Sequence, residues 1–276
     1  MDFPFVLLCL LSLGVAFALG ALVRPRGAAT EPASDALRAR FEEEMREKTR
    51  ELERSNRELE EFASVVSHDL KSPLRGIASL AEWIAADYAH VLDDEGREQL
   101  DLLRDRTIRM HRMIEGILEY SRAARGSDRR GRVDTSELVH SVVELLSPPP
   151  NIAVRVEEPL PPCHCNETQL GQVFQNLIVN AIQHHGRPCG VVTVRGAKDG
   201  ARVRFSVADD GVGIAPEHHQ RIFRIFQTLQ ADRKARSTGI GLSIVQKIVQ
   251  LNGGELELES MPGEGTTFRF SMPGLP

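Results

Sequence analysis

The sequence predicts an α+β chain in which a transmembrane helix and a coiled coil lead into a dimeric helical hairpin and an α/β sandwich with a mixed sheet. Three observations support this fold class. Residues 4–23 form an uncharged apolar run, a heptad spacing continues for more than five heptads from Met45, and short strands alternate with helices beyond residue 132. These patterns indicate a membrane span, a coiled coil and a mixed α/β domain, respectively.

Residues 4–23 are long enough to cross a bilayer, because twenty helical residues rise roughly 30 Å. Arg24 and Arg26 follow at once, and the positive-inside rule then places the C-terminal part of the chain in the cytoplasm. We therefore expect a single-pass anchor. A cleaved signal peptide is the alternative, since Ala16-Phe17-Ala18 resembles a cleavage site, although the run lacks a preceding basic segment.

Composition excludes one class of partner. The net charge of -5 and the 5% content of aromatic residues argue against a nucleic-acid-binding protein. The run Cys163-His164-Cys165 suggests a metal site, and His184, His185 and Cys189 are candidate further ligands, but zinc sites usually use a second ligand pair with characteristic spacing. The alternative is a set of reduced thiols.

A short linker and a long charged helix are predicted after the apolar run. Residues 24–35 read as a linker rich in Pro, Ala and Gly, and residues 36–61 as a charged coiled-coil signalling helix. The heptad seam from Met45 to Ile84 includes Asn56, and Asn at a core position favours a fixed register and a dimer. If Met45 is a d position, His68 falls at f, on the solvent face.

A second helix follows the first after a break at Asp87–Gly96. Its apolar residues repeat with 3-4 spacing from Leu100 to Ser121, and the helix runs to about residue 124. Two seamed helices joined by a short loop form a hairpin, and a second copy is needed to bury both seams. We therefore expect residues 62–124 to form a four-helix bundle in a homodimer. Residues 125–132 read as a basic linker.

Residues 133–273 have the pattern of a separate α/β domain. Asp134 and Asn166 are the predicted N-caps of helices at 137–146 and 167–185. A third helix is expected within Ser237–Asn252. Strands are predicted from alternation and turn signals at 152–156, 191–195 and 202–207, with a closing hairpin between Leu256 and Phe270.

Three clusters in this domain are candidates for one nucleotide site. Asn176 and Asn180 share a helix face, and an amide oxygen can ligate Mg²⁺ without adding charge beside phosphates. The run 209–214 offers a carboxylate for an exocyclic amine, with glycines that permit close approach of a ligand. The run 237–242 places glycines at a helix N-terminus, where free N–H groups favour phosphate. Taken singly, each cluster has a more ordinary interpretation. An Asn pair on a helix is more often a cap or a surface pair, an Asp-Gly run is more often an ordinary turn, and a lone Gly-x-Gly is weak evidence for a phosphate site.

Order and spacing make the three clusters specific together, and they resemble the N, G1 and G2 boxes of the two-component sensor histidine kinases. Residues 221–226 resemble the F box between G1 and G2. Upstream, residues 62–74, which include His68, resemble the phosphoacceptor H box. The amino-acid sequence of this segment is most similar to that of phytochrome-type kinases. The resemblance covers residues 62–273.

The resemblance implies an ATP-dependent protein-histidine kinase that phosphorylates its own His68 from Mg-ATP and passes the phosphoryl group to an aspartate of a response regulator. His68 would attack through one ring nitrogen while Asp69 holds the other. Asn180 would bind Mg²⁺. The remaining ATP-binding residues would be Asn176, Gln183, His184, Asp209, Gly211, Gly213, Phe226, Thr238, Gly239, Gly241 and Leu242. The protein would lie in the bacterial cytoplasmic (inner) membrane, with its catalytic part, residues 133–273, in the cytoplasm.

Several positions depart from the family pattern. Gln183 stands where a Lys often meets phosphate, His184 where an aromatic ring often stacks on adenine, and Ser237 where the G2 box usually begins with Gly. Ser72 replaces the usual residue four positions after the histidine, which puts phosphatase activity in doubt. Two alternatives stay open: a signalling scaffold with a degenerate ATP domain, and an ATP-driven clamp of the kind found in heat-shock chaperones and mismatch-repair proteins.

Overall fold

The computed structural model describes residues 31–123, 130–228 and 238–275. The predicted membrane span, residues 4–23, lies outside the described residues. Within the described ranges, no helix combines the length and the apolar character that crossing a bilayer requires. The chain divides into two units between residues 57 and 58.

Helix α2 (Glu31–Asp87) is continuous over 57 residues and joins the predicted coiled-coil segment to the hairpin without a break. The predicted linker at 24–35 is wrong for its last residues, because α2 already begins at Glu31. The reason is that Pro32 lies in the first helical turn, where the missing N–H has no intrahelical partner to lose. Pro is therefore compatible with a helix start here, although its presence suggested a linker.

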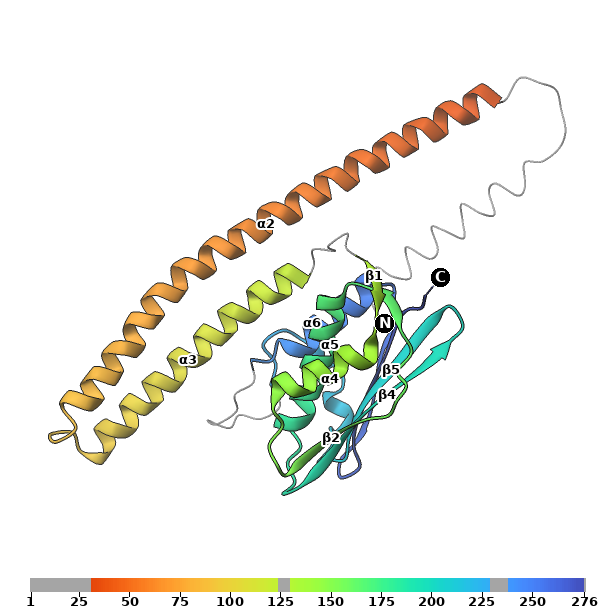
Figure 1. The fold of residues 1–276 in the computed structure, drawn as a ribbon. Helices are drawn as coiled ribbons and strands as arrows, with labels where there is room; N and C mark the ends of the chain where they lie inside the picture. The colour runs from red at the N-terminus through yellow and green to blue at the C-terminus, as the bar shows by residue number, and fades with distance from the viewer. Residues whose placement is uncertain (1–30, 124–129, 229–237, 276) are drawn as a thin grey trace. The chain divides into compact units, whose positions relative to one another are not determined.

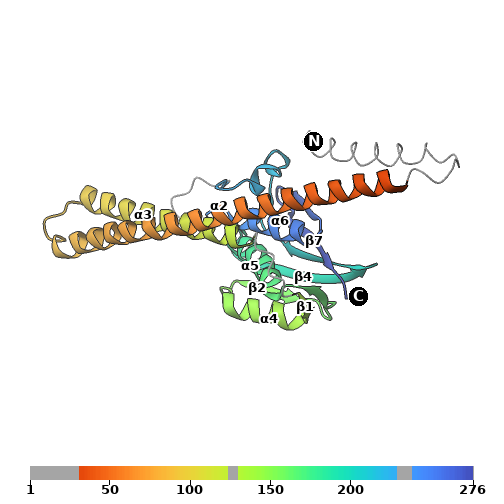
Figure 2. The same cartoon turned by 90° about the horizontal axis from the view of Figure 1, so that it is seen from above.

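Helix α3 (Asp94–Ala123) runs back along the C-terminal half of α2, which confirms the predicted hairpin and its break (Figures 1 and 2). The buried side chains of the hairpin are Ser67, Leu74 and Ala81 on α2 and Thr107 and Ile114 on α3. The three α2 residues repeat every seven positions, one residue after the predicted seam at Val66 and Pro73. The hairpin thus buries a face adjacent to the heptad seam and leaves the seam itself outward.

The seam residues of α2 from Val66 onward stay accessible in the single chain. Ile77 is 42% exposed and Leu80 is 54% exposed. A continuous apolar stripe of this kind is what a second copy of the helix would cover. The stripe therefore supports the predicted dimer. The dimer itself stays a prediction.

A paired substitution tests the predicted dimer. Light scattering of the full chain is expected to report twice the monomer mass, and Ile77→Lys with Leu80→Lys is expected to give the monomer mass, because two buried ammonium groups would be desolvated in each helix. Val65→Lys is the matched control, since Val65 is 60% exposed and lies off the seam. A dimer that survives the seam substitutions would place the interface elsewhere.

The C-terminal half is a two-layer α/β sandwich. Helices α4 (Thr135–Leu146), α5 (Glu167–Gln183) and α6 (Gly241–Leu251) cover one face of a five-stranded sheet (Figures 1 and 2). Its strands, in spatial order, are β2 (Ile152–Val156), β4 (Gly190–Asp199), β5 (Arg202–Asp209), β7 (Gly265–Pro273) and β6 (Leu256–Met261). β2 pairs with β4 in parallel and all other pairs are antiparallel, so the predicted mixed sheet is confirmed. Two short 3-10 turns, η1 (Pro216–His218) and η2 (Arg221–Phe223), follow β5.

Side-chain caps fix where the first two helices of the sandwich begin. The Asp134 carboxylate accepts hydrogen bonds from the N–H groups of Ser136 and Glu137, and Asn166 accepts one from Gln169. Both caps were predicted from the sequence, because a short polar side chain before an apolar periodic run can satisfy the free N–H groups of a helix start.

A second, two-stranded sheet was not predicted. β1 (Gly131–Val133) pairs antiparallel with β3 (Cys163–Cys165), so the predicted linker at 125–132 is wrong for its last two residues. The thiols of Cys163 and Cys165 point inward, and their Sγ atoms lie 3.2 Å apart. In the described part of the chain, no group of three or more His, Cys, Asp or Glu side chains is arranged to hold a metal ion.

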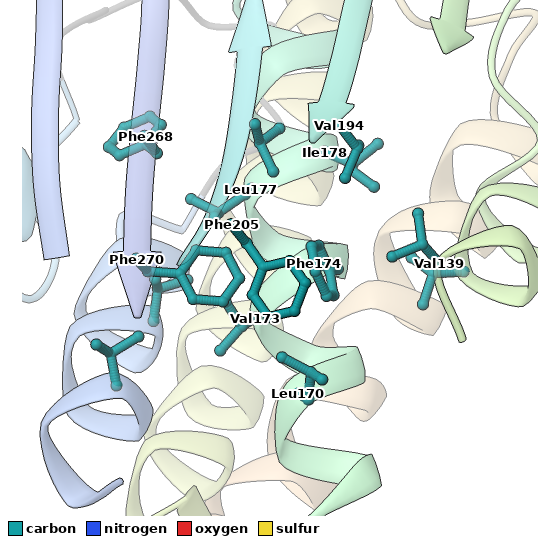
Figure 3. Packing of buried hydrophobic residues seen from close by; sticks show 14 of the residues in the cluster. Val139, Leu170, Val173, Phe174, Leu177, Ile178, Val194, Phe205, Phe268 and Phe270 are labelled. Carbon is teal, nitrogen blue, oxygen red and sulfur yellow. The ribbon is translucent and has the colours of Figure 1, made fainter. Parts of the chain in front are cut away.

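The core of the sandwich lies between the sheet and α5 (Figure 3). The ring of Phe174 meets Phe205 and Phe270 edge-on, with centroid distances of 5.3 and 5.4 Å. All three rings are fully buried, and each buried aromatic contributes on the order of 2–3 kcal/mol from apolar burial. This packing fixes the orientation of α5. The opposite face of the same helix carries Asn176 and Asn180.

Candidate nucleotide-binding site and phosphoacceptor

A cavity of about 330 Å³ opens between α5, the start of α6 and the turn that follows β5. It brings together ten of the residues predicted to bind ATP. These are Asn176, Asn180, Gln183, His184, Asp209, Gly213, Thr238, Gly239, Gly241 and Leu242. The three sequence clusters, which lie up to about sixty residues apart, thus line one pocket of the size that small-molecule sites have.

One wall of the cavity is the polar face of α5. Asn176 and Asn180 lie one turn apart, and the Nδ2 group of Asn176 donates a hydrogen bond to the Gln172 carbonyl at 2.9 Å. A Cβ atom added at Gly241 would lie 2.7 Å from Asn176 Oδ1, so the glycine lets the start of α6 approach this amide. Two amide oxygens on one wall are a donor set that fits Mg²⁺ beside phosphates.

The opposite wall is the turn after β5. Asp209 ends the strand, and its Oδ1 atom accepts a hydrogen bond from the N–H of Gly211 at 2.9 Å. Burial raises the pKa of the Asp209 carboxyl above its usual range, although the Gly211 N–H, the charge of His185 and the Thr266 N–H act in the opposite direction. Gly213 has a φ of 69°, and a side chain there would overlap the Met261 carbonyl. Only glycine fits this turn without strain.

The two residues predicted to line the site that do not reach the cavity act through their backbones. Gly211 holds the Asp209 carboxylate, as described. Phe226 is 43% exposed, and its side chain does not line the cavity. Its N–H donates instead to the Gly239 carbonyl at 3.0 Å, and its φ of 66° turns the chain toward that bond. Ser237 and the basic residues that precede it, Arg233, Lys234 and Arg236, lie outside the described residues.

The cavity also has walls that the motifs did not predict. They are Val179, Val212, Ile214, Ile222, Gln227, Thr228 and Thr266. All seven are apolar or neutral polar side chains, so their residue types do not distinguish them from ordinary core or loop positions. Val212 and Ile214 are the exceptions, because they belong to the quoted run 209–214. Their apolar side chains beside a carboxylate suit the flat face and polar edge of an aromatic base.

The candidate phosphoacceptor is exposed on α2. The side chain of His68 is 86% exposed, and its Nδ1 atom lies 3.2 Å from Asp69 Oδ1. Because an ionised carboxylate only accepts hydrogen bonds, this contact requires the proton on Nδ1 and leaves the lone pair on Nε2. One turn further along α2, Lys71 pairs with Glu115 of α3 at 3.3 Å. His68 and Asp69 are thus at the hairpin surface and do not line the cavity.

Two family models match the chain in the regions that these two sites occupy. Residues 58–126 match the His Kinase A (phospho-acceptor) domain. Residues 165–276 match the model described as histidine kinase-, DNA gyrase B-, and HSP90-like ATPase. The first match contains His68, and the second contains every described residue that lines the cavity.

Individual proteins are similar over most of the chain. Cyanobacterial phytochrome B from a Nostoc species is 39% identical over 80% of this chain and 30% of its own length. The structure of full-length ShkA in complex with AMPPNP has a TM-score of 0.57 and 31% identity over 77% of this chain and 45% of that one. The structure of histidine kinase ThkA in complex with response regulator protein TrrA has a TM-score of 0.53 and 25% identity, over 78% of this chain and 62% of that one. The chain thus spans under half the length of the first relatives it matches.

Proposed function

Because this chain belongs to the two-component sensor histidine kinases, which are ATP-dependent protein-histidine kinases, we propose that it transfers the γ-phosphoryl group of ATP to His68. A response regulator then accepts the group on an aspartate. The observation that carries this proposal is the pairing, on one chain, of a histidine whose Nε2 lone pair faces solvent with a cavity lined by amide oxygens, a half-buried carboxylate and glycines. ThkA bound to its response regulator supports the second partner.

In this proposal the residues of the cavity position the nucleotide. Asp209 accepts the hydrogen bond of the adenine amino group, and Thr238, Gly239 and Gly241 lie at the start of α6, where N–H groups face phosphate. Asn180 holds Mg²⁺, which supplies neutralisation of phosphate charge when bound. Asp69 keeps the Nδ1 proton of His68 in place and so directs Nε2 at the phosphorus.

Membrane anchoring through residues 4–23 and homodimerisation through α2 complete the proposal. Arg24 and Arg26 would then keep the kinase half on the cytoplasmic side. The anchor is tested by fractionation, since a spanning helix stays in the membrane pellet after a carbonate wash whereas a peripheral protein is released.

The central experiment incubates the full chain with γ-labelled ATP and Mg²⁺. Phosphohistidine is acid-labile and base-stable, so label with those properties supports the kinase. Nucleotide binding without any label would instead support the scaffold alternative. That alternative is favoured by Gln183, which stands at the cavity wall where the family often has a Lys. Label that moves to a purified receiver domain would support the second step.

The pH dependence of ATP affinity tests the role of Asp209. The charged form of Asp209 is the stronger acceptor for the adenine amino group, and its pKa is raised by burial. ATP affinity is therefore expected to be full at pH about 8 and to fall on acidification at a higher pH than an ordinary aspartate would give. Titration calorimetry between pH about 8 and about 5 measures it. Asp209→Asn is the control for protonation of the phosphates, and an identical pH profile in that variant would contradict the role.

A further inference from the structure

A buried histidine outside the recognised motifs connects α5 to the turn that carries Asp209. His185 follows the last turn of α5 and is only 1% exposed. Its Nε2 atom lies 2.7 Å from Asp210 Oδ1, and because the carboxylate only accepts, Nε2 carries the proton. A side chain at Gly190 would overlap the imidazole, so this glycine provides the space in which the ring lies.

The partner carboxylate of His185 is itself tied to the sheet. Asp210 Oδ1 also accepts a hydrogen bond from the N–H of Val191 at 2.7 Å, at the start of β4. The carbonyl of His185 accepts one from the N–H of Val212 at 3.0 Å. The residues on either side of Gly211 are thus both bonded to His185, one through the ring and one through the main chain.

These bonds control the direction of the neighbouring carboxylate. Gly211, which lies between the two residues bonded to His185, donates its N–H to Asp209 Oδ1 at 2.9 Å. A shift of Asp210 would move that N–H and with it the carboxylate that lines the cavity.

The imidazole has a cost that an apolar side chain would avoid. Within the described residues, His185 Nδ1 is buried and has no hydrogen-bond partner. Such an atom is normally destabilising, because it has lost its bonds to water. An apolar side chain would remove the unpaired atom, whereas the bond from Nε2 to Asp210 needs the histidine. The cost therefore indicates that this bond has a use beyond filling the core.

We propose that His185 is a positioning residue for adenine recognition: through Asp210 it fixes the turn at 209–211 and thereby aims the Asp209 carboxylate at the amino group of the base. The inference rests on the proposed function, in which Asp209 accepts that amino group. His185 itself touches no nucleotide atom. Its loss should therefore weaken discrimination between bases and leave the contribution of the phosphates intact.

Two nucleotides separate base recognition from phosphate binding. Purine riboside triphosphate lacks the amino group of ATP and is otherwise the same. The full chain is expected to bind ATP at least about tenfold more tightly, which is typical of a hydrogen bond to a charged group. In Asp210→Ala and in His185→Leu this ratio should fall to within about threefold, through weaker ATP binding alone. His185→Gln keeps a donor near the Nε2 position and should restore most of the ratio.

Asp210→Ala tests the positioning role independently of the buried ring. The side chain of Asp210 is 56% exposed, so Asp210→Ala is expected to fold even if a change at buried His185 does not. An unchanged ratio in Asp210→Ala, or an equal loss of affinity for both nucleotides, would overturn the positioning role. Equal affinity of the unmodified chain for the two nucleotides would overturn the adenine contact of Asp209, and the proposal with it. Retained ATP labelling of His68 in that case would show that the kinase assignment itself stands.

Discussion

Replacing His68 by Gln is expected to abolish autophosphorylation, by at least about 100-fold in initial rate, while ATP affinity stays within about twofold. The substitution removes the only group at this position that can form a phosphoramidate bond. The His68 side chain is on the surface of α2 and outside the cavity, so neither the helix nor nucleotide binding depends on it. Both quantities are measured on the full chain, the first with γ-labelled ATP and the second by titration calorimetry.

His90→Gln is a matched control for this experiment. His90 is an exposed histidine in the turn that ends α2, and it has no place in the proposed chemistry. It should keep the label of the unmodified chain. Wild-type labelling of the His68 variant would identify another phosphoacceptor, and the H box of the sequence would then be a structural helix only.

The second large effect is expected at Asn180. Asn180→Asp adds a full negative charge to the cavity wall where the phosphates are proposed to lie. At an effective dielectric of about 20, two unit charges about 5 Å apart repel by about 3 kcal/mol, part of which a carboxylate regains by binding Mg²⁺ more strongly. A net loss of about tenfold or more in Mg-ATP affinity is expected. Titration calorimetry at saturating Mg²⁺ measures it.

Asn166→Asp provides the same change of charge on the same helix. Asn166 is the N-cap of α5, and Asp caps a helix start as well as Asn does. This variant should bind Mg-ATP like the unmodified chain, because the new charge lies at the other end of α5 from Asn180. Equal affinity in both variants would remove Asn180 from the nucleotide site.

The sequence predicted those parts of the fold that depend on local chemistry. Asp134 and Asn166 mark helix starts through their own hydrogen bonds, and the alternation of Ile152, Val154 and Val156 marks a half-buried strand. The end of β4 was missed, because its outer residues, such as Lys198 and Asp199, are exposed and carry no alternation. β1 and β3 have three residues each, too few for any periodicity to appear.

Strand order and the cavity walls depend on contacts distant in the sequence. The parallel pairing of β2 with β4 brings Ile152 beside Gly190, and nothing in either segment specifies that register. Similarly, the bond between His185 and Asp210 joins residues that are far apart along the chain. The sequence alone offers His185 only as a candidate metal ligand. The motif residues could be predicted because each has a side chain or backbone suited to nucleotide chemistry. Thr266 and Ile222 have no such feature, and only the fold brings them to the cavity wall.

The pairing of β1 with β3 shortens the tether between the two halves of the kinase. It fixes Gly131 to the sandwich, so only residues 124–130 separate it from the end of α3 at Ala123. Even fully extended, that segment reaches at most about 28 Å. Glu115, which pairs with Lys71 one turn from His68, lies only about 12 Å along α3 from its end. In the proposed function, this short tether holds the bound nucleotide at an effective concentration on the order of millimolar near the hairpin that carries His68.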